Sequence, residues 1–110
     1  MDYTDVLRHL SLHDERVLAD EPPRLGPVLD PKTLALVRLA ALVAAGGAVP
    51  SYGAQSDAAV NAGATAAEIV DVLVGIVPVV GLPRVVAAAP KLALALGHDV
   101  DEAPGIEPVG

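Results

Sequence analysis

The 110-residue sequence contains no cysteine, no phenylalanine and no tryptophan, and its aromatic content is two tyrosines. Without a thiol, the chain has no disulfide bond, no thiolate nucleophile and no cysteine-ligated metal. Yet 53% of the residues are hydrophobic, so the apolar content consists mainly of alanine, valine and leucine. These side chains let helices approach closely, but each of them buries little area.

Charge is scarce in the middle of the chain. Residues 31–97 contain three acids and four bases, whereas residues 1–30 contain seven acids and three bases, and residues 98–110 contain four acids and no base. Ordinary domains have about 25% charged residues. A charge-poor helical middle predicts a homo-oligomer, in which apolar faces are buried against copies of the same chain. The absence of a basic patch argues against nucleic acid as a partner.

Apolar runs long enough to span a membrane are also missing. Only 12 residues separate Asp71 from Arg84, and the uncharged stretch 39–56 is interrupted by Gly46, Gly47 and Pro50. A spanning helix needs about 20 apolar residues. The N-terminus begins with acids and lacks the apolar run of a signal peptide. We therefore predict a soluble cytoplasmic protein with no membrane contact.

The most apolar stretch lies between Thr65 and Gly81. Thr65 and Glu68 have the spacing of a capping box, in which each side chain bonds the backbone N–H of the other residue. The helix that follows is apolar on nearly every side, with Asp71 as its one charge. Such a helix must be covered on all sides, and one small chain supplies too little cover. This stretch is therefore the strongest reason to expect an oligomer.

Other helices are predicted on both sides of this stretch. Residues 4–20 predict one or two short amphipathic helices, and Pro22 to Pro27 form a linker. A helix is expected to start at Asp30-Pro31 and to end at Gly46-Gly47. The next is expected to start at Ser51 as N-cap, although Pro50 also fits this boundary, and to end at Gly63. The last is expected to start at Pro83 and to end at Gly97.

The sequence predicts two further details of these helices. In the helix after Pro31, the expected buried face consists of Leu34, Val37, Ala41 and one side of residues 42–45. Pro78 is expected to kink its helix or end it near residues 74–77, and Pro90 to break or bend the last helix.

No segment has the period of two that strands show. We predict an all-α protein of five to seven helices. Its expected parts are an N-terminal helical segment with a proline-rich linker (1–28), a helical domain (29–97) and an acidic mobile tail (98–110).

Three elements together resemble the carboxymuconolactone decarboxylase family, which includes the alkylhydroperoxidase D-like proteins. They are residues 29–33 (Leu-Asp-Pro-Lys-Thr), residues 62–69 (Ala-Gly-Ala-Thr-Ala-Ala-Glu-Ile) and residues 81–83 (Gly-Leu-Pro), in the family's order and spacing. The resemblance covers about residues 29–97. It implies an orthogonal helical bundle whose protomers interlock as trimers or hexameric rings, with a pocket lined by the second and third helices.

The catalytic signature of that family is absent. Its peroxidase branch has a Cys-x-x-Cys followed four residues later by His, and these positions fall on Ala48, Ser51 and Gln55. The acidic residue of the preceding helix falls near Ala35 or Leu36, and the His and Glu of the decarboxylase branch are also missing. Thiol peroxidase activity is therefore excluded, since the thiolate is the nucleophile.

Four polar residues are candidates for substrate binding: Arg38, Ser51, Tyr52 and Gln55. On one interpretation Ser51 caps a helix, Tyr52 and Gln55 form structural hydrogen bonds, and Arg38 pairs with an acid such as Asp57 or Asp71. On the other, the four residues line a cavity in which Arg38 grips a carboxylate and Tyr52 acts as a hydrogen-bond donor or weak acid.

Arg84 and two histidines are further polar residues that could bind a partner or a metal. Arg84 lies at the start of the last helix, where its charge opposes the helix dipole, so an anionic partner is expected. His9 and His13 are four residues apart, but the Glu of a zinc-hydrolase motif is missing, and solvated histidines are the better interpretation. We expect no metal and no cofactor.

Two functions remain open. The first is a family-like decarboxylase or isomerase of a small lactone or carboxylate. The second is a non-catalytic homo-oligomeric module for binding or assembly. An open cavity of ligand size with Arg38 pointing into it favours the first, and a closed, packed space behind Gln55 favours the second.

Overall fold

The computed structural model describes residues 2–12 and 28–97, which form five α-helices and no strand. The helices are α1 (Tyr3–Ser11), α2 (Pro31–Ala45), α3 (Val49–Asn61), α4 (Ala66–Val80) and α5 (Leu82–Ala95). The prediction of an all-α protein is confirmed. The expected acidic tail (98–110), the whole linker expected from Pro22 to Pro27 and residues 13–20 of the expected N-terminal helical segment lie outside the described residues.

Helix α1 belongs to a different unit from the other four helices. Asp2 caps it, since its carboxylate accepts from the backbone N–H of Asp5 at 3.0 Å. Leu7 and Leu10 of this helix are exposed, and none of the helix's residues is buried.

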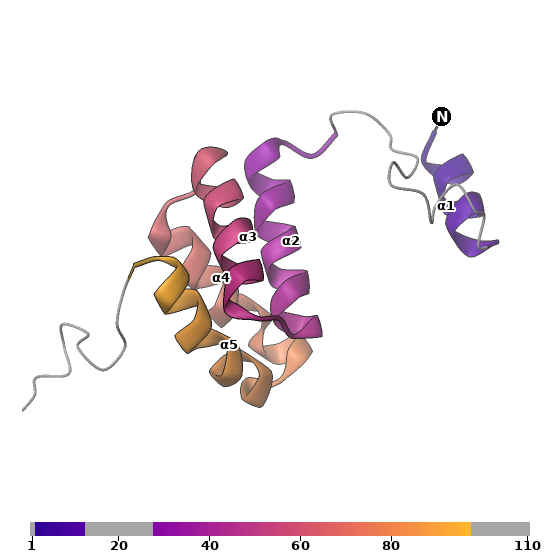
Figure 1. The fold of residues 1–110 in the computed structure, drawn as a ribbon. Helices are drawn as coiled ribbons and strands as arrows, with labels where there is room; N and C mark the ends of the chain where they lie inside the picture. The colour runs from indigo at the N-terminus through magenta and orange to yellow at the C-terminus, as the bar shows by residue number, and fades with distance from the viewer. Residues whose placement is uncertain (1, 13–27, 98–110) are drawn as a thin grey trace, which may run out of the picture. The chain divides into compact units, whose positions relative to one another are not determined.

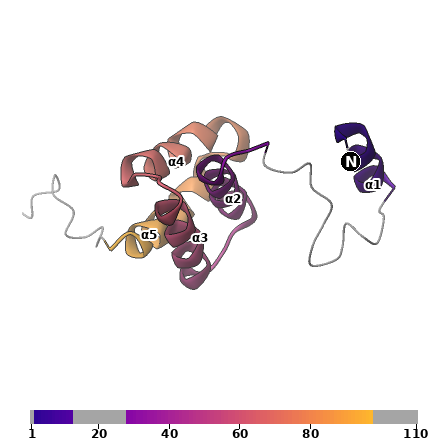
Figure 2. The ribbon, with the colours of Figure 1, turned by 90° about the horizontal axis from the view of Figure 1, so that it is seen from above.

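Helices α2 to α5 form the second unit, a bundle around one apolar core (Figure 1). α2 packs against the other three helices, and α3 packs extensively against α2 and α5. Figure 2 shows α3 and α4 on opposite sides of the bundle, with α2 and α5 between them. The largest fully buried side chains of the core are Tyr52, Leu39, Ile69, Leu92 and Val43. No helix within residues 2–12 and 28–97 combines the length and apolar character that crossing a bilayer requires.

Several helix ends lie where the sequence predicts them. The Thr65 hydroxyl accepts from the Glu68 backbone N–H at 3.1 Å, and the Glu68 carboxylate accepts from the Thr65 N–H at 2.9 Å. The predicted capping box of α4 is therefore confirmed. Gly63 follows α3 with a φ of 101°, in the left-handed region where glycine is favoured.

The predicted cap of α3 is wrong. The N-cap is Ala48, which offers no side-chain hydrogen bond, and Pro50 lies within the first two positions of the helix. Ser51 is inside the first turn, and its backbone N–H donates to the Ala48 carbonyl at 3.0 Å. Proline's fixed φ suits the first turn of a helix. Pro50 therefore favours a helix start at this point, although no side chain caps it.

Neither helix ends at its proline, because α4 continues through Pro78 to Val80 and α5 continues through Pro90 to Ala95. The expected end near residues 74–77 and the expected break at Pro90 are therefore wrong, while the alternative of a kink or bend stays a prediction. A proline inside a helix removes the hydrogen bond to the carbonyl four residues earlier. Pro78 is exposed, as is Val74, four residues before it. The same holds for Pro90 and Val86. Water can therefore solvate both carbonyls, which lowers the cost of each proline.

The buried face of α2 also differs from the prediction. Its buried residues are Ala35, Leu39 and Val43, whereas Val37 is 52% exposed. Alanine, leucine and valine occupy nearly all sides of this helix, so its apolar periodicity does not select a face. The neighbouring helices select it instead.

Candidate functional site

The turn between α2 and α3 positions the candidate site. The backbone N–H of Gly46 donates to the Leu42 carbonyl at 2.8 Å, and Gly46 has a φ of 86°. A Cβ atom on Gly47 would lie 2.6 Å from Leu42 Cδ1, closer than any ordinary contact. Two glycines therefore let the chain leave α2 sharply and start α3 next to its end.

Two cations of α5 bind the backbone of this turn. Arg84 Nη1 donates to the Ala44 carbonyl at 2.8 Å, and Lys91 Nζ donates to the Gly47 carbonyl at 2.8 Å. The last carbonyls of a helix lack intrahelical donors and form its negative end. The two side chains are seven residues apart, two helical turns, and so share one face of α5. They therefore supply hydrogen-bond donors to the carbonyls at the C-terminal end of α2 and in the turn that follows.

The prediction for Arg84 is thus corrected in one respect. Its partner is a carbonyl at the negative end of α2 and not an acidic side chain. Sequence reasoning did not select Lys91. The available signal was its spacing of seven residues from Arg84, since these are two of the four bases in residues 31–97.

These cations border a small cavity, called here the basic hollow. Its volume is about 70 Å³. It is lined by Val43, Gly46, Gly47, Tyr52, Arg84, Ala87, Ala88 and Lys91.

Tyr52 is the one predicted site residue that lines this cavity. Its side chain is 1% exposed, and burial raises the pKa of its hydroxyl above the ordinary value of 10.0. Desolvation disfavours the charged phenolate. At neutral pH Tyr52 is therefore protonated and can donate a hydrogen bond or a proton, but it is not a base.

The other three predicted residues do not join Tyr52 in this cavity. Arg38 and Ser51 are exposed, and Gln55 is half-buried. Within the described part of the chain no ion pair links Arg38 to Asp57 or Asp71, although one of these pairs was a predicted alternative. The substrate-binding role of these residues stays a prediction.

The chemistry open to the basic hollow is limited. The sequence has no thiol, and residues 2–12 and 28–97 contain no group of three or more side chains that could hold a metal ion. His9 lies on α1, and His13 is not among the described residues. What remains is a protonated phenol in a cavity that Arg84 and Lys91 also line, and such donors suit hydrogen bonding to an anion. Ligand pockets typically measure about 300–1,000 Å³, so the cavity of one chain is too small for a whole lactone.

Comparison with known proteins gives one match. The sequence model of the carboxymuconolactone decarboxylase family matches residues 5–94. The matched range begins before residue 29 and includes most of α1. No curated protein and no solved structure matches the chain.

Proposed function

Because the chain belongs to the carboxymuconolactone decarboxylase family, we propose that it acts as a homo-oligomeric helical module for binding or assembly. Its copies, three or six in number, cover the outer side of α4. Thiol peroxidase activity is excluded, because the sequence contains no cysteine. The cytoplasm remains the predicted location.

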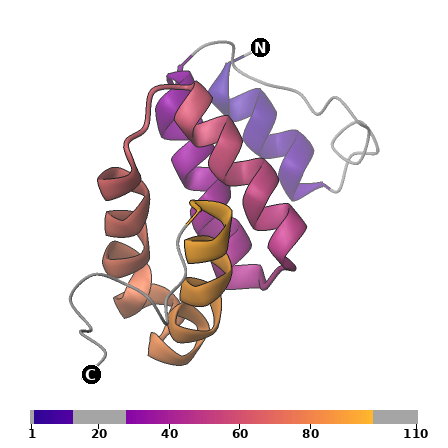
Figure 3. The ribbon, with the colours of Figure 1, turned by 60° about the vertical axis from the view of Figure 1, so that its left-hand side comes forward.

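The observation that carries this proposal is the exposure of α4. Figure 3 shows α4 at the left side of the bundle, joined to α5 by the turn at Gly81. Val70, Val74 and Val79 are 47%, 64% and 85% exposed, respectively. Asp71 is the one charged residue among the exposed residues of this helix.

The exposed apolar surface continues along the chain into α5. Leu82 is 59% exposed and Val86 is 58% exposed. Burial of apolar area stabilises by about 25 cal/mol per Å², and monomeric proteins rarely leave large apolar patches uncovered. A second copy of the chain is the occupant we propose, because most soluble oligomers are closed homo-oligomers, and a ring of identical copies can cover the apolar face of each one.

The test is the mass of the protein in solution. Size-exclusion chromatography with light scattering at micromolar concentration is expected to give three or six times the chain mass of 11.1 kDa. Val74→Glu adds a charge to the exposed face and is expected to release monomers. Val60→Glu, at a residue of α3 that is 50% exposed, is the matched control and should leave the mass unchanged. A compact monomer of the parent protein would refute the proposal.

A second candidate function is decarboxylation or isomerisation of a small carboxylate or lactone. The observation that favours it is that the protonated Tyr52 lines the basic hollow together with Arg84 and Lys91. In a decarboxylation, the C–C bond to the carboxylate breaks, CO₂ leaves, and the electron pair moves into the conjugated carbonyl of the lactone. Tyr52 would then protonate the substrate carbon, and water would restore the phenol. Because the basic hollow of one chain is too small for a whole lactone, this candidate requires that a neighbouring copy enlarge the hollow. Arg38, Ser51 and Gln55 are the proposed further contacts.

This candidate predicts ligand binding in addition to assembly. A thermal-shift screen of small aromatic and lactone carboxylates is expected to find an acid that stabilises the parent and stabilises Tyr52→Phe and Arg38→Ala less. If every acid that binds stabilises these variants as much as the parent, the catalytic candidate is wrong. The oligomeric proposal is unaffected by that outcome.

A further inference from the structure

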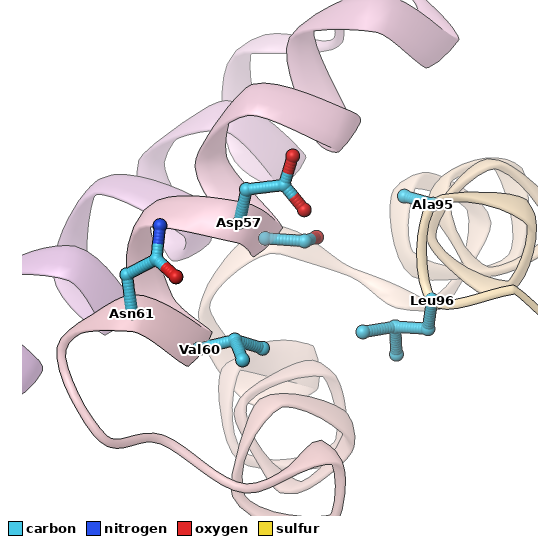
Figure 4. A pocket seen from close by; sticks show the side chains of 6 residues that line it. Asp57, Val60, Asn61, Ala95 and Leu96 are labelled. Atoms are coloured by element: carbon cyan, nitrogen blue, oxygen red, sulfur yellow. The ribbon is translucent and has the colours of Figure 1, made fainter.

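A second hollow lies between the C-terminal ends of α3 and α5, and it is called here the acidic hollow. Its volume is about 450 Å³, within the range of small-molecule pockets. It is lined by Ser56, Asp57, Val60, Asn61, Ala95 and Leu96. Figure 4 shows Val60 and Leu96 extending into it from opposite sides, with Asp57 and Asn61 on the α3 side.

Ser56 leaves a polar group of this hollow unsatisfied. The residue is 1% exposed, and its Oγ is the one buried side-chain polar atom without a hydrogen-bond partner in the part of the chain that the structure describes. An unpaired buried hydroxyl is costly, and most such groups find a partner. A ligand that donates a hydrogen bond to Oγ would remove this cost.

The charges around the hollow are of one sign. Asp57 is exposed, and no cation among the described residues pairs with it. Asn61 and Ala95 are the last residues of α3 and α5, so the hollow lies at the negative ends of two helices. Neither helix has a basic residue in its last turn. Among the described residues that line the hollow, the one charged group is the Asp57 carboxylate, so a cation placed here meets that carboxylate and two helix ends.

From these observations we propose that the acidic hollow binds a small amine in its ammonium form, with a short apolar body. The ammonium group lies between Asp57 and Ser56 Oγ, where it donates to the carboxylate and to the hydroxyl oxygen. The apolar body lies against Val60 and Leu96. The site is separate from the basic hollow and requires no chemical step.

Benzylammonium is a suitable probe, with benzyl alcohol and benzoate as neutral and anionic controls of similar shape. Titration followed by ¹H–¹⁵N NMR is expected to shift the backbone amides of the acidic hollow with benzylammonium, and much less with the two controls. Failure of benzylammonium to shift these amides, or equal shifts with benzyl alcohol, would overturn the proposal.

Two variants separate a binding role from a structural one. Asp57→Asn is expected to weaken benzylammonium binding about fivefold, as for an exposed ion pair. Ser56→Ala is expected to weaken it about threefold without lowering the thermal midpoint of the free protein, since it removes an unpaired hydroxyl. Asp71→Asn is the matched control, because it makes the same charge change on α4, outside the hollow. If Asp71→Asn weakens binding as much as Asp57→Asn, the effect is one of net charge and the site is refuted.

Discussion

The basic hollow and the acidic hollow both lie beside α3, and they differ in whether basic side chains lie at the C-terminal ends of the nearby helices. At the basic hollow, Arg84 and Lys91 donate to carbonyls at and after the end of α2, and the remaining space is about 70 Å³. At the acidic hollow, α3 and α5 end without a basic residue in their last turns, and the space is about 450 Å³. One set of polar groups is satisfied within the chain, whereas the other leaves Ser56 unpaired. The polar contacts at the basic hollow therefore hold the fold together, whereas the acidic hollow keeps an unpaired hydroxyl for the proposed amine.

The largest expected effect comes from removing the wall of the basic hollow. Tyr52→Ala leaves a cavity at a side chain that is 1% exposed, and we expect a loss of about 3–5 kcal/mol in the free energy of unfolding, typical of aromatic truncation in a core. Urea denaturation followed by circular dichroism measures it. Tyr52→Phe keeps the ring and should cost far less; a similar loss in both variants would show that the hydroxyl, and not the packing, is what matters.

A smaller effect is expected from the cation that holds the turn. Lys91→Met keeps much of the side-chain length but leaves the Gly47 carbonyl without its charged donor, in a half-buried position. We expect a destabilisation of about 1.5–3 kcal/mol, the range for hydrogen bonds to charged groups. The same denaturation experiment measures it.

Arg38→Met is the matched control for Lys91→Met, because Arg38 is an exposed base on α2. Exposed substitutions of this kind usually change stability by less than about 0.5 kcal/mol. Equal losses in the two variants would mean that the hydrogen bond to Gly47 contributes nothing specific.

The smallest expected effect concerns the start of α4, where the Glu68 carboxylate accepts a hydrogen bond from the backbone N–H of the N-cap residue Thr65. Hydrogen bonding from the Thr65 backbone, and then from Lys32 at 2.9 Å, lowers the pKa of Glu68 below its ordinary value of 4.5. A lowered folded-state pKa means that the stabilisation is fully present above the unfolded-state pKa and is lost as the pH falls through the folded-state pKa. Unfolding experiments at a series of pH values should show this loss below 4.5.

Glu68→Gln should make stability less dependent on pH in that acidic range. Asp71→Asn provides the comparison, since Asp71 is an exposed acid of the same helix outside the capping box. An equal change in the pH dependence of both variants would contradict the assignment to Glu68.

The fold was largely predictable, but the candidate site was predictable only in part. The capping box at Thr65 and the glycine after α3 depend on residues within one helical turn, so they are visible in the sequence. The buried face of α2 was not visible, because nearly all sides of that helix are apolar. Of the four predicted site residues, Tyr52 lines the basic hollow, while Lys91, which also lines it, was missed.

The amino-acid sequence by itself determined the helical class, the positions of several helix ends and the exclusion of thiol chemistry. Each of these follows from composition or from residues a few positions apart. The tertiary structure alone decided that the helices continue through Pro78 and Pro90, and which carbonyls Arg84 and Lys91 bind. Those two contacts join residues 40 and 44 positions apart. Such contacts depend on how helices pack against one another, and no local pattern encodes that arrangement.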